Sequence, residues 1–573
     1  MTRNLAAKAE LSIILLMACI PLLIHLPYRV NIFLSWEGAY RISEGQLPFR
    51  DFGIPLGGMY WVIPALFFKI FGAKLITLVK AQVFINVLAG LAFRSILNSL
   101  GVGRGVRLVS VFLFCLSYSF FNFWPWYNHT VIVYELLGLA CLLRYIRFDP
   151  ATHPAPATHP APATGVKAVM RYRWLWLALA GFFITCSFLT KQDGGGIAVL
   201  LAGGLLAVYG WLSRKWLPLL IFIGSFVFFL LLLILPFLSH GFGYWFNHGQ
   251  PPHSSRVSVF DITSELFGSS LWIKFYLFLI VLLGVIRYRS LAALKADPKG
   301  VLLMVLTIGM LGEAAILQVT SYTPPDNNIF FHSFAFAGIL ALLSPLLPER
   351  LEKPGVTVVL LAGVLFWWSG VWWKYTQRLA GPFLSRPAAA SPTGENVVNK
   401  DTYMINPDTT YRPTDIPTEL WVDCGLPAFR RISMPAPTAD GIHRLLDMDL
   451  IRKYRREMVS DTGNAKLRVL NMSELTPLAA EIPFELEKNS QLPLWYHLGV
   501  GMFNRQADTF ETRVRRRYYD LVLFEYVPTL NNFYPFRVRD SLRLHYSQVD
   551  SFMAPRRGPE SQGVIEVFVR PAD

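Results

Sequence analysis

The sequence predicts a polytopic α-helical membrane protein of about eleven transmembrane helices, with an added interfacial helix and a small C-terminal α/β soluble domain. The first observation is composition: hydrophobic residues make up 53% of the 573 residues, and the mean hydropathy is +0.40. The second is that long uncharged apolar runs fill the first two thirds of the chain. These two features together are typical of a multi-spanning membrane protein.

The third observation is the distribution of charge. The formal net charge is +15, but residues 1–375 contain 28 Lys and Arg against 14 Asp and Glu, whereas residues 376–573 contain 25 against 24. The basic excess therefore belongs to the membrane part, where cytoplasmic loops gather Lys and Arg. This distribution argues against a nucleic-acid-binding surface, and the nearly neutral tail is typical of a soluble domain.

Eleven apolar segments are each long enough to cross a hydrocarbon core of about 30 Å when their boundaries are allowed to shift by several residues. They are expected at 11–30, 75–95, 107–124, 130–147, 174–190, 195–213, 216–237, 271–287, 300–319, 331–347 and 355–373.

A twelfth apolar segment, 54–71, could just cross the membrane or lie in its interface. If it lies in the interface, every later basic cluster falls on the inner side; if it crosses, every one of them moves outside. The charge bias, together with Pro55 and Pro64 in the segment, favours an interfacial helix on the outer face. This choice predicts a cytoplasmic N-terminus and a C-terminal domain on the periplasmic, outer face.

Composition also predicts the domain boundaries. Residues 1–375 form the expected transmembrane catalytic domain, interrupted on the inner side by a Pro/Ala/His linker at 149–166 in which ATHPAP occurs twice. A Pro/Ala/Ser-rich linker follows at 376–400, and 401–573 form the α/β domain. In that domain, strands are expected at 467–472 and 520–526, and helices at 441–458 and 536–550.

The segment 31–72 concentrates charge at the outer membrane surface, between two apolar segments. Glu37, Arg41, Arg50 and Asp51 lie in it. Carboxylates and guanidinium groups in this position are candidates for acid–base chemistry and phosphate binding. The structural alternative is that the four residues pair with one another as interfacial salt bridges.

Other polar residues gather on the same expected outer face. Lys191 and Asp193 follow one apolar segment, and His248 and Arg256 lie in the long loop 238–270. His332 follows the loop 320–330. Inner loops are short or merely basic. This asymmetry predicts that any chemistry takes place on the outer side.

Trp36-Glu37, the run GQLPFRD at 45–51, Pro55 and the helix ending in Phe-Gly at 66–72 resemble the first outer loop of the GT-C class of membrane glycosyltransferases. This class includes the protein O-mannosyltransferases and the lipid A aminoarabinose transferases. The chain departs from the pattern in having one acid, Glu37, where the family often has two, and Gly-Ile-Pro at 53–55 in place of the Lys-Pro-Pro of some members.

The resemblance implies an inverting transfer of a sugar from a polyprenyl-phosphate donor to an acceptor lipid, glycan or protein, at the outer face of a bacterial inner membrane. The acceptor must lose a proton, for which Glu37 is the first candidate base and Asp51 the second. The leaving phosphate needs cations. The candidates are Lys191, Arg41, Arg50 and Arg256, while Asp193, His248 and His332 are candidates for the acceptor cavity.

No cofactor is expected. A divalent metal is compatible with the class, but the sequence has no clustered ligand set that requires one. Two alternatives remain from the sequence: a transporter or flippase for lipid-linked saccharides, and a non-catalytic membrane scaffold of the cell envelope. A transporter predicts internal repeats and polar broken helices near the midplane.

Overall fold

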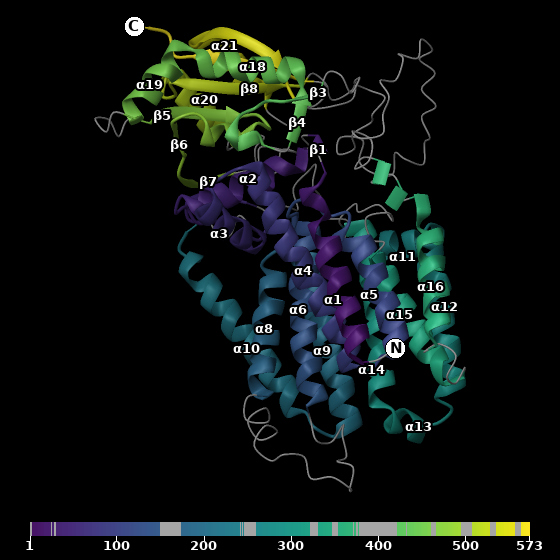
Figure 1. Ribbon diagram of the computed structural model, residues 1–573. Coiled ribbons are helices and arrows are strands. Elements are labelled where there is room, and N and C mark those ends of the chain that lie inside the picture. Colours follow the sequence, from purple (N-terminus) through teal and green to yellow (C-terminus); the bar gives the residue numbers. More distant parts are fainter. Residues whose placement is uncertain are drawn as a thin grey trace.

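The computed structural model consists of a long helical bundle with a small sheet-containing domain at one end (Figure 1). It describes residues 3–24, 26–27, 30–54, 56–148, 173–240, 242, 245, 259–320, 330–346, 353–370, 372–373, 376–377, 421–430, 432–459, 466–493, 507–527, 535–555 and 563–572. The linker predicted at 149–166 lies outside these residues, as do His248 and Arg256.

Helices occur at all eleven expected positions of the bundle. They are α1 (Arg3–Cys19), α4 (Leu75–Ser99), α5 (Arg104–Phe114), α6 (Tyr127–Arg147), α8 (Arg173–Phe188), α9 (Gln192–Ser213), α10 (Leu217–Ile234), the pair α11 (Val259–Gly268) and α12 (Leu271–Arg287), α14 (Pro298–Thr320), α15 (Phe331–Leu343) and α16 (Pro354–Trp367). A short helix, α13 (Leu291–Ala296), joins α12 to α14 at the end of the bundle far from the C-terminal domain (Figure 1).

Six helices in the described part of the chain are long and apolar enough to cross a membrane, or seven if α11 and α12, bent by 84°, are one broken span. The fold class is therefore confirmed, whereas the count of eleven crossings stays a prediction. The first expected boundary is wrong. The apolar helix α1 begins at Arg3 and its last turn ends at Leu22, because Pro21 and Pro27 each lack the N–H that a continuing helix needs.

The segment expected to be interfacial forms a turn at Met59–Trp61 and the helix α3 (Val62–Phe71). Ten residues of α-helix extend about 15 Å, half of the ~30 Å that a crossing requires. Helix α3 therefore does not span by itself. It lies with α2 (Val30–Ser43) at the end of the bundle that carries the C-terminal domain (Figure 1).

The C-terminal domain contains a five-stranded sheet of order β6-β5-β8-β10-β9, in which β6, β5 and β8 run parallel and the other pairs antiparallel. Its elements are β3 (Trp421–Asp423), β4 (Ile432–Pro435), α18 (Ala436–Asp447), α19 (Asp449–Val459), β5 (Leu467–Met472), β6 (Phe484–Glu485), β7 (Asn489–Pro493), α20 (Ala507–Arg515), β8 (Leu521–Tyr526), α21 (Phe536–His545), β9 (Ser547–Met553) and β10 (Val564–Val569).

Alternating residues of the strands bury opposite faces of this sheet, as the period of two requires. On β8, Val522 and Phe524 pack with α20 and α21, whereas Leu521 and Leu523 join the cluster that contains α18. Both expected strands are confirmed. The helix expected at 536–550 is wrong in its second half, since residues from Ser547 form strand β9 paired with β10.

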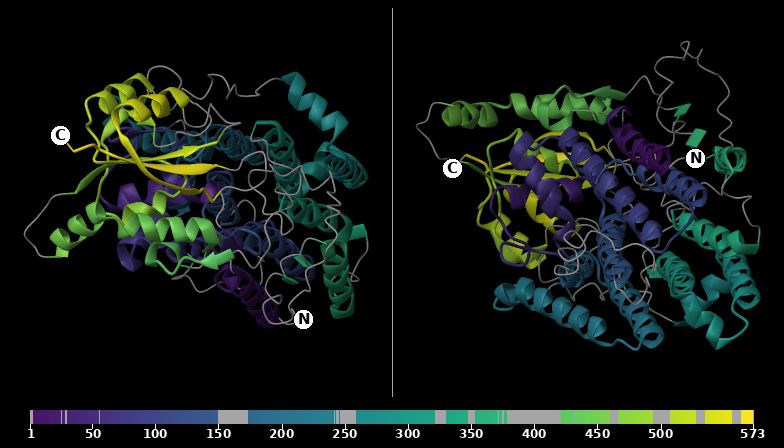
Figure 2. Two further views of the ribbon diagram at one scale, coloured as in Figure 1. Left: turned by 90° about the horizontal axis from the view of Figure 1, so that it is seen from above. Right: turned by 60° about the horizontal axis from the view of Figure 1, so that its bottom comes forward.

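Two short strand pairs attach this domain to the N-terminal part of the chain. Strand β1 (Leu26–Pro27) pairs in parallel with β4, and β2 (Phe52–Gly53) pairs in parallel with β7. One hydrophobic cluster runs through the junction and contains both Trp36 of α2 and Leu475 of the domain. Seen along the bundle, the domain lies toward one side and leaves the teal to green helices after residue 259 uncovered (Figure 2).

Candidate active site at the junction

Helix α2 packs closely against the turn that precedes α3. Gly38 makes this approach possible, because a Cβ at this position would overlap the indole ring of Trp61. The Trp61 Nε1–H donates a hydrogen bond of 3.0 Å to the carbonyl oxygen of Leu34, one turn earlier on α2. The residue before Gly38 is Glu37, so this contact fixes the helix segment that carries the first candidate acid.

Glu37 forms an ion pair with Arg41, four residues later on the same helix. The Arg41 Nη2 and Nε atoms lie 2.9 and 3.0 Å from Glu37 Oε1, and the side chains are 10% and 14% exposed. Arg41 Nη1 also donates to Gln46 Oε1 and to the backbone carbonyl of Glu487, each at 2.9 Å. The guanidinium thus connects the candidate acid to the C-terminal domain.

Burial raises the pKa of the Glu37 carboxyl above its ordinary value, and the charge and hydrogen bond of Arg41 oppose this rise without cancelling it. A carboxylate with a raised pKa is a stronger base than an ordinary glutamate. Glu37 lines a narrow cavity of about 20 Å³ beneath the domain, together with Asn471, Thr476 and Glu485. This volume holds about one water molecule.

Asp51 has a structural role in the turn that follows α2. Its Oδ2 accepts hydrogen bonds from the Leu47 N–H at 2.8 Å and from Arg50 Nη2 at 2.6 Å. Its carbonyl oxygen accepts from the Asn489 N–H at 2.7 Å, at the start of β7. Phe49 closes the turn in the left-handed region, with φ of 67°. Asp51 therefore holds the turn against the domain.

The surroundings of Asp51 have the opposite effect on its pKa to those of Glu37. Partial burial alone would raise it, but hydrogen bonds from Arg50 and from the Leu47 N–H, together with the nearby charges of Arg50 and Lys488, lower the pKa of the Asp51 carboxyl below its ordinary value. A carboxylate of lowered pKa is a weak base. Of the two sequence-predicted acids, Glu37 is chemically better suited to accept a proton.

A second buried ion pair lies at the start of α9. Lys191 Nζ is 2.8 Å from Asp193 Oδ2, which also accepts a hydrogen bond of 2.8 Å from Thr320 Oγ1 at the end of α14. The side chains of Lys191 and Asp193 are 11% and 19% exposed. The structure thus brings together these two predicted residues.

The loop between α2 and α3 contacts the backbone immediately before Lys191. The Gly57 N–H donates to the Thr190 carbonyl at 3.2 Å, and the Met59 N–H donates to the Leu189 carbonyl at 3.3 Å. A side chain at position 57 would overlap the Leu189 carbonyl, so the approach requires glycine. The predicted outer segment and Lys191 are therefore neighbours in the fold, although they are far apart in sequence.

Aromatic rings connect the two ion pairs. Lys191 Nζ lies 5.9 Å from the ring centroid of Tyr127, which is 5.9 Å from Tyr60. Tyr60 is 4.5 Å from Trp61, Trp61 is 6.0 Å from Phe52, and the Arg41 guanidinium is 5.6 Å from Phe52. Glu37 lines a small cavity under the C-terminal domain, and Lys191 is not among the residues that line that cavity.

His332 is in a different environment from both pairs. Its ring stacks on Trp272 with a centroid distance of 4.1 Å, and its Nδ1 is 2.8 Å from the Tyr276 hydroxyl. Trp368 is a further neighbour. The candidate acceptor role of His332 therefore has no support from its contacts, which are those of an aromatic cluster among α12, α15 and α16.

Several residues of the site were not predicted from the sequence. Gln46, Thr320, Tyr127 and the Glu487 carbonyl all contact the candidate charges. Gln46 lies within the GQLPFRD run, which was a usable signal. Glu487 is 450 positions from Glu37 along the sequence, and only the docking of the C-terminal domain brings it close. Among the described residues, no group of three or more His, Cys, Asp or Glu could hold a metal ion.

Comparisons with known proteins identify similar solved structures. ArnT from Cupriavidus metallidurans bound to undecaprenyl phosphate aligns with a TM-score of 0.45 and 12% identity over 98% of this chain and 97% of its own. The Archaeoglobus fulgidus oligosaccharyltransferase tethered with an acceptor peptide aligns with a TM-score of 0.42 and 12% identity, over 98% of this chain and 74% of its own. No protein-family model and no curated sequence matches the chain.

Both of these neighbours are GT-C membrane glycosyltransferases, the class that segment 31–72 resembles. Because identities are near 12% and TM-scores are below 0.5, the two likenesses carry no conclusion about the activity of this chain.

Proposed function

We propose that this protein is a membrane glycosyltransferase that moves a sugar from a polyprenyl-phosphate-linked donor to an acceptor, with inversion at the anomeric carbon. The observation that carries the proposal is Glu37. It is a largely buried carboxylate with a raised pKa, in a cavity between a helical membrane bundle and a docked polar domain. A base at this position can receive a proton from an acceptor while the donor lipid stays in the bilayer.

In the proposed reaction the acceptor hydroxyl or amine gives its proton to a Glu37 carboxylate oxygen. The acceptor atom then forms a bond to the anomeric carbon of the donor sugar from the face opposite the phosphate. The bond between the anomeric carbon and the phosphate oxygen breaks, and polyprenyl phosphate leaves with the bonding electron pair. One acceptor attack gives one inversion, and atoms and charges balance without a redox cofactor or nucleotide.

Lys191 is our proposed partner for the donor phosphate. It lies between the end of α8 and the start of α9, against the loop that follows α2, and its side chain is buried. A buried cation binds a developing phosphate charge more strongly than an exposed one, since less water screens it. Arg41 is less suited, because hydrogen bonds to Glu37, Gln46 and Glu487 already occupy it. Asp193 holds Lys191 in place.

The scaffold alternative also has a specific observation in its favour. Segment 31–72 is the platform on which the C-terminal domain docks, through β2–β7 pairing and a hydrogen bond from the Thr476 hydroxyl to the Phe33 carbonyl. On this alternative, Asp51 and Arg41 only hold the C-terminal domain in place, through their contacts with Asn489 and Glu487. The alternative predicts no role for the Glu37 carboxylate as a base, and this difference can be measured.

The test compares Glu37→Gln with Asp540→Asn, an equivalent carboxyl-to-amide change at an exposed position of α21. Membrane vesicles containing the full chain are supplied with polyprenyl-phosphate-linked hexose or pentose, and release of polyprenyl phosphate is measured. We expect Glu37→Gln to lower the rate by about 10²–10⁴-fold, the usual contribution of a general base. The Asp540→Asn variant should keep the wild-type rate. Equal rates in all three proteins would eliminate Glu37 as the base.

A further inference from the structure

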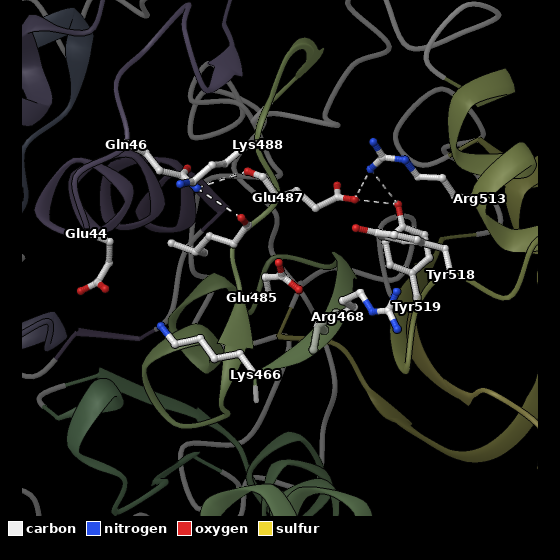
Figure 3. A pocket seen from close by; sticks show the side chains of 12 residues that line it. Glu44, Gln46, Lys466, Arg468, Glu485, Glu487, Lys488, Arg513, Tyr518 and Tyr519 are labelled. Atoms are coloured by element: carbon white, nitrogen blue, oxygen red, sulfur yellow. Dashed lines mark hydrogen bonds and ion pairs between the residues drawn. The ribbon is translucent and has the colours of Figure 1, made fainter. Parts of the chain in front are cut away.

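A larger polar cavity lies beside the Glu37 cavity, between the turn after α2 and the C-terminal domain (Figure 3). Its volume is about 420 Å³, within the range of small-ligand sites, which is about 300–1,000 Å³. Glu44 and Gln46 line it from the N-terminal side. The domain contributes Lys466, Arg468, Val469, the run 485–488, Arg513, Tyr518 and Tyr519.

Four cations and three carboxylates face this cavity. One carboxylate, Glu487, is neutralised within the protein, since Arg513 forms an ion pair with it and the Tyr519 hydroxyl donates to its Oε1 at 2.8 Å. Among the described residues, neither Lys466 nor Lys488 forms an ion pair. Lys466 and Lys488 are therefore cations of this cavity without an ion-pair partner among the described residues, whereas Arg468 Nε lies 3.8 Å from Asp520 Oδ2.

The cavity also offers groups that suit a sugar. Tyr518 is 39% exposed, and the Arg468 and Arg513 guanidinium groups lie 4.9 and 5.4 Å from its ring centroid. In Figure 3 the Lys466 ammonium and the Glu485 carboxylate lie on the same side of Arg468 and the two tyrosines. Carboxylates accept hydrogen bonds from hydroxyl groups, and an amphipathic tyrosine contacts apolar C–H faces while its hydroxyl stays hydrated.

We propose that this cavity binds a saccharide that carries an anionic group, phosphate or carboxylate, and that this saccharide is the acceptor of the transfer reaction. Lys466 and Arg468 bind the anionic group, because guanidinium and ammonium groups form charge-assisted hydrogen bonds with such oxygens. Glu44 and Glu485 accept hydrogen bonds from sugar hydroxyls. The claim that this saccharide is the acceptor rests on the proposed function.

The connection to Glu37 is geometric. The two cavities share four lining residues, Val469, Glu485, Leu486 and Glu487. Gln46 lines the larger cavity and accepts a hydrogen bond from Arg41, the ion-pair partner of Glu37. A saccharide held in the larger cavity would therefore contact the same 485–487 segment that lines the cavity of the proposed base.

The binding test uses the full chain in lipid nanodiscs, with glucose 6-phosphate, glucuronate, glucose and inorganic phosphate as probes. We expect both anionic sugars to bind with a Kd of about 1 mM or below. Glucose and inorganic phosphate should each bind about tenfold more weakly, since glucose lacks the anionic group and inorganic phosphate lacks the sugar ring and its hydroxyl groups. Equal binding of glucose, or equal binding of inorganic phosphate, would overturn the proposal, as would no binding of either anionic sugar.

Lys466→Ala and the double variant Lys466→Ala/Arg468→Ala are expected to raise the Kd of both anionic sugars by about tenfold or more. The control is Lys453→Ala, an exposed cation on α19 that does not line the cavity. The double variant could unfold the domain, because Arg468 is ion-paired with Asp520. The single variant Lys466→Ala keeps the test valid in that event, because Lys466 is exposed and has no ion pair among the described residues. Unchanged binding in Lys466→Ala would overturn the assignment.

The same variants separate this inference from the proposed function. Glu37→Gln should lower the transfer rate by about 10²–10⁴-fold and leave probe binding unchanged. If Glu37→Gln lowers transfer in this way while Lys466→Ala leaves both probe binding and transfer intact, the acceptor cavity is wrong and the glycosyltransferase proposal stands. If Glu37→Gln retains transfer, the proposed base is wrong, and the acceptor role of the cavity falls with it even where anionic sugars bind.

Discussion

The Glu37–Arg41 pair and the Lys191–Asp193 pair both join residues that are close in the sequence, but their surroundings in the fold differ. Each joins opposite charges within four positions, and each has an N–O distance of 2.8–2.9 Å. The first pair lies under the C-terminal domain and is tied to the Glu487 carbonyl. The second lies between bundle helices and is tied to Thr320. On the proposed function, the first pair serves the chemistry on the acceptor and the second binds the donor phosphate, and the predictions below test this division.

A disulfide between strand β2 and strand β7 of the C-terminal domain tests whether the domain must move away from Glu37 during turnover. The cavity of about 20 Å³ beside Glu37 is too small for a sugar, so we expect the domain to move during turnover. Phe52 and Asn489 are partners in the β2–β7 pair, and adjacent strands lie about 4.8 Å apart, within disulfide range. Oxidised Phe52→Cys/Asn489→Cys should lose transfer to the level of Glu37→Gln, while binding of the proposed polyprenyl-phosphate-linked donor stays unchanged.

Reduction should restore the activity of this double variant, and the two single cysteine variants serve as controls for loss of the Phe52 ring. A fully active oxidised protein would mean that the acceptor reaches Glu37 with the domain docked as it is here.

Loss of the Lys191 charge should have the next largest effect. We expect Lys191→Gln to raise the KM for the donor by roughly ten- to hundredfold, as for one charged hydrogen bond of about 1.5–3 kcal/mol, with a smaller change in kcat. Glu37→Gln should instead lower kcat, because the base acts in the chemical step. Steady-state kinetics on both variants measures this split. Arg289→Gln, an exposed cation at the other end of the bundle, is the control; an unchanged KM in Lys191→Gln would remove Lys191 from the donor site.

The smallest expected effect is a shift in the pH profile of Arg41→Gln. Arg41 lowers the pKa of Glu37 against the raising effect of burial, so its removal should raise that pKa further. A base must be ionised to act. Activity is therefore lost as the pH falls through the Glu37 pKa, and the acidic limb of the profile should move to higher pH. The profile of kcat/KM reports this change, and an acidic limb that stays in place would show that another group titrates.

Sequence reasoning was accurate where a local pattern decides the structure. The apolar runs located the bundle helices because any segment surrounded by hydrocarbon must satisfy its backbone hydrogen bonds internally. The short apolar strands β5 and β8 were likewise located from their own residues. The i,i+4 spacing of Glu37 and Arg41 allows their ion pair on a helix, which the salt-bridge alternative had anticipated.

Sequence reasoning failed where distant segments decide the structure. Residues from Ser547 have a helix-like pattern, but β10 offers a strand edge and they pair with it. The sequence also did not show that Asp51 lies in the turn on which the domain docks, through its contacts with Leu47 and Asn489; its role as a catalytic acid stays a prediction.

The sequence by itself determined that this is a helical membrane protein with a polar segment between apolar helices, because hydrophobic burial and charge placement are properties of single segments. Only the tertiary structure decided which charges share a cavity. Glu37 meets residues 485–487, and Lys191 meets Thr320, through contacts that join positions more than a hundred residues apart. Such contacts depend on how the bundle and the domain pack together, and no local pattern in the sequence encodes that packing.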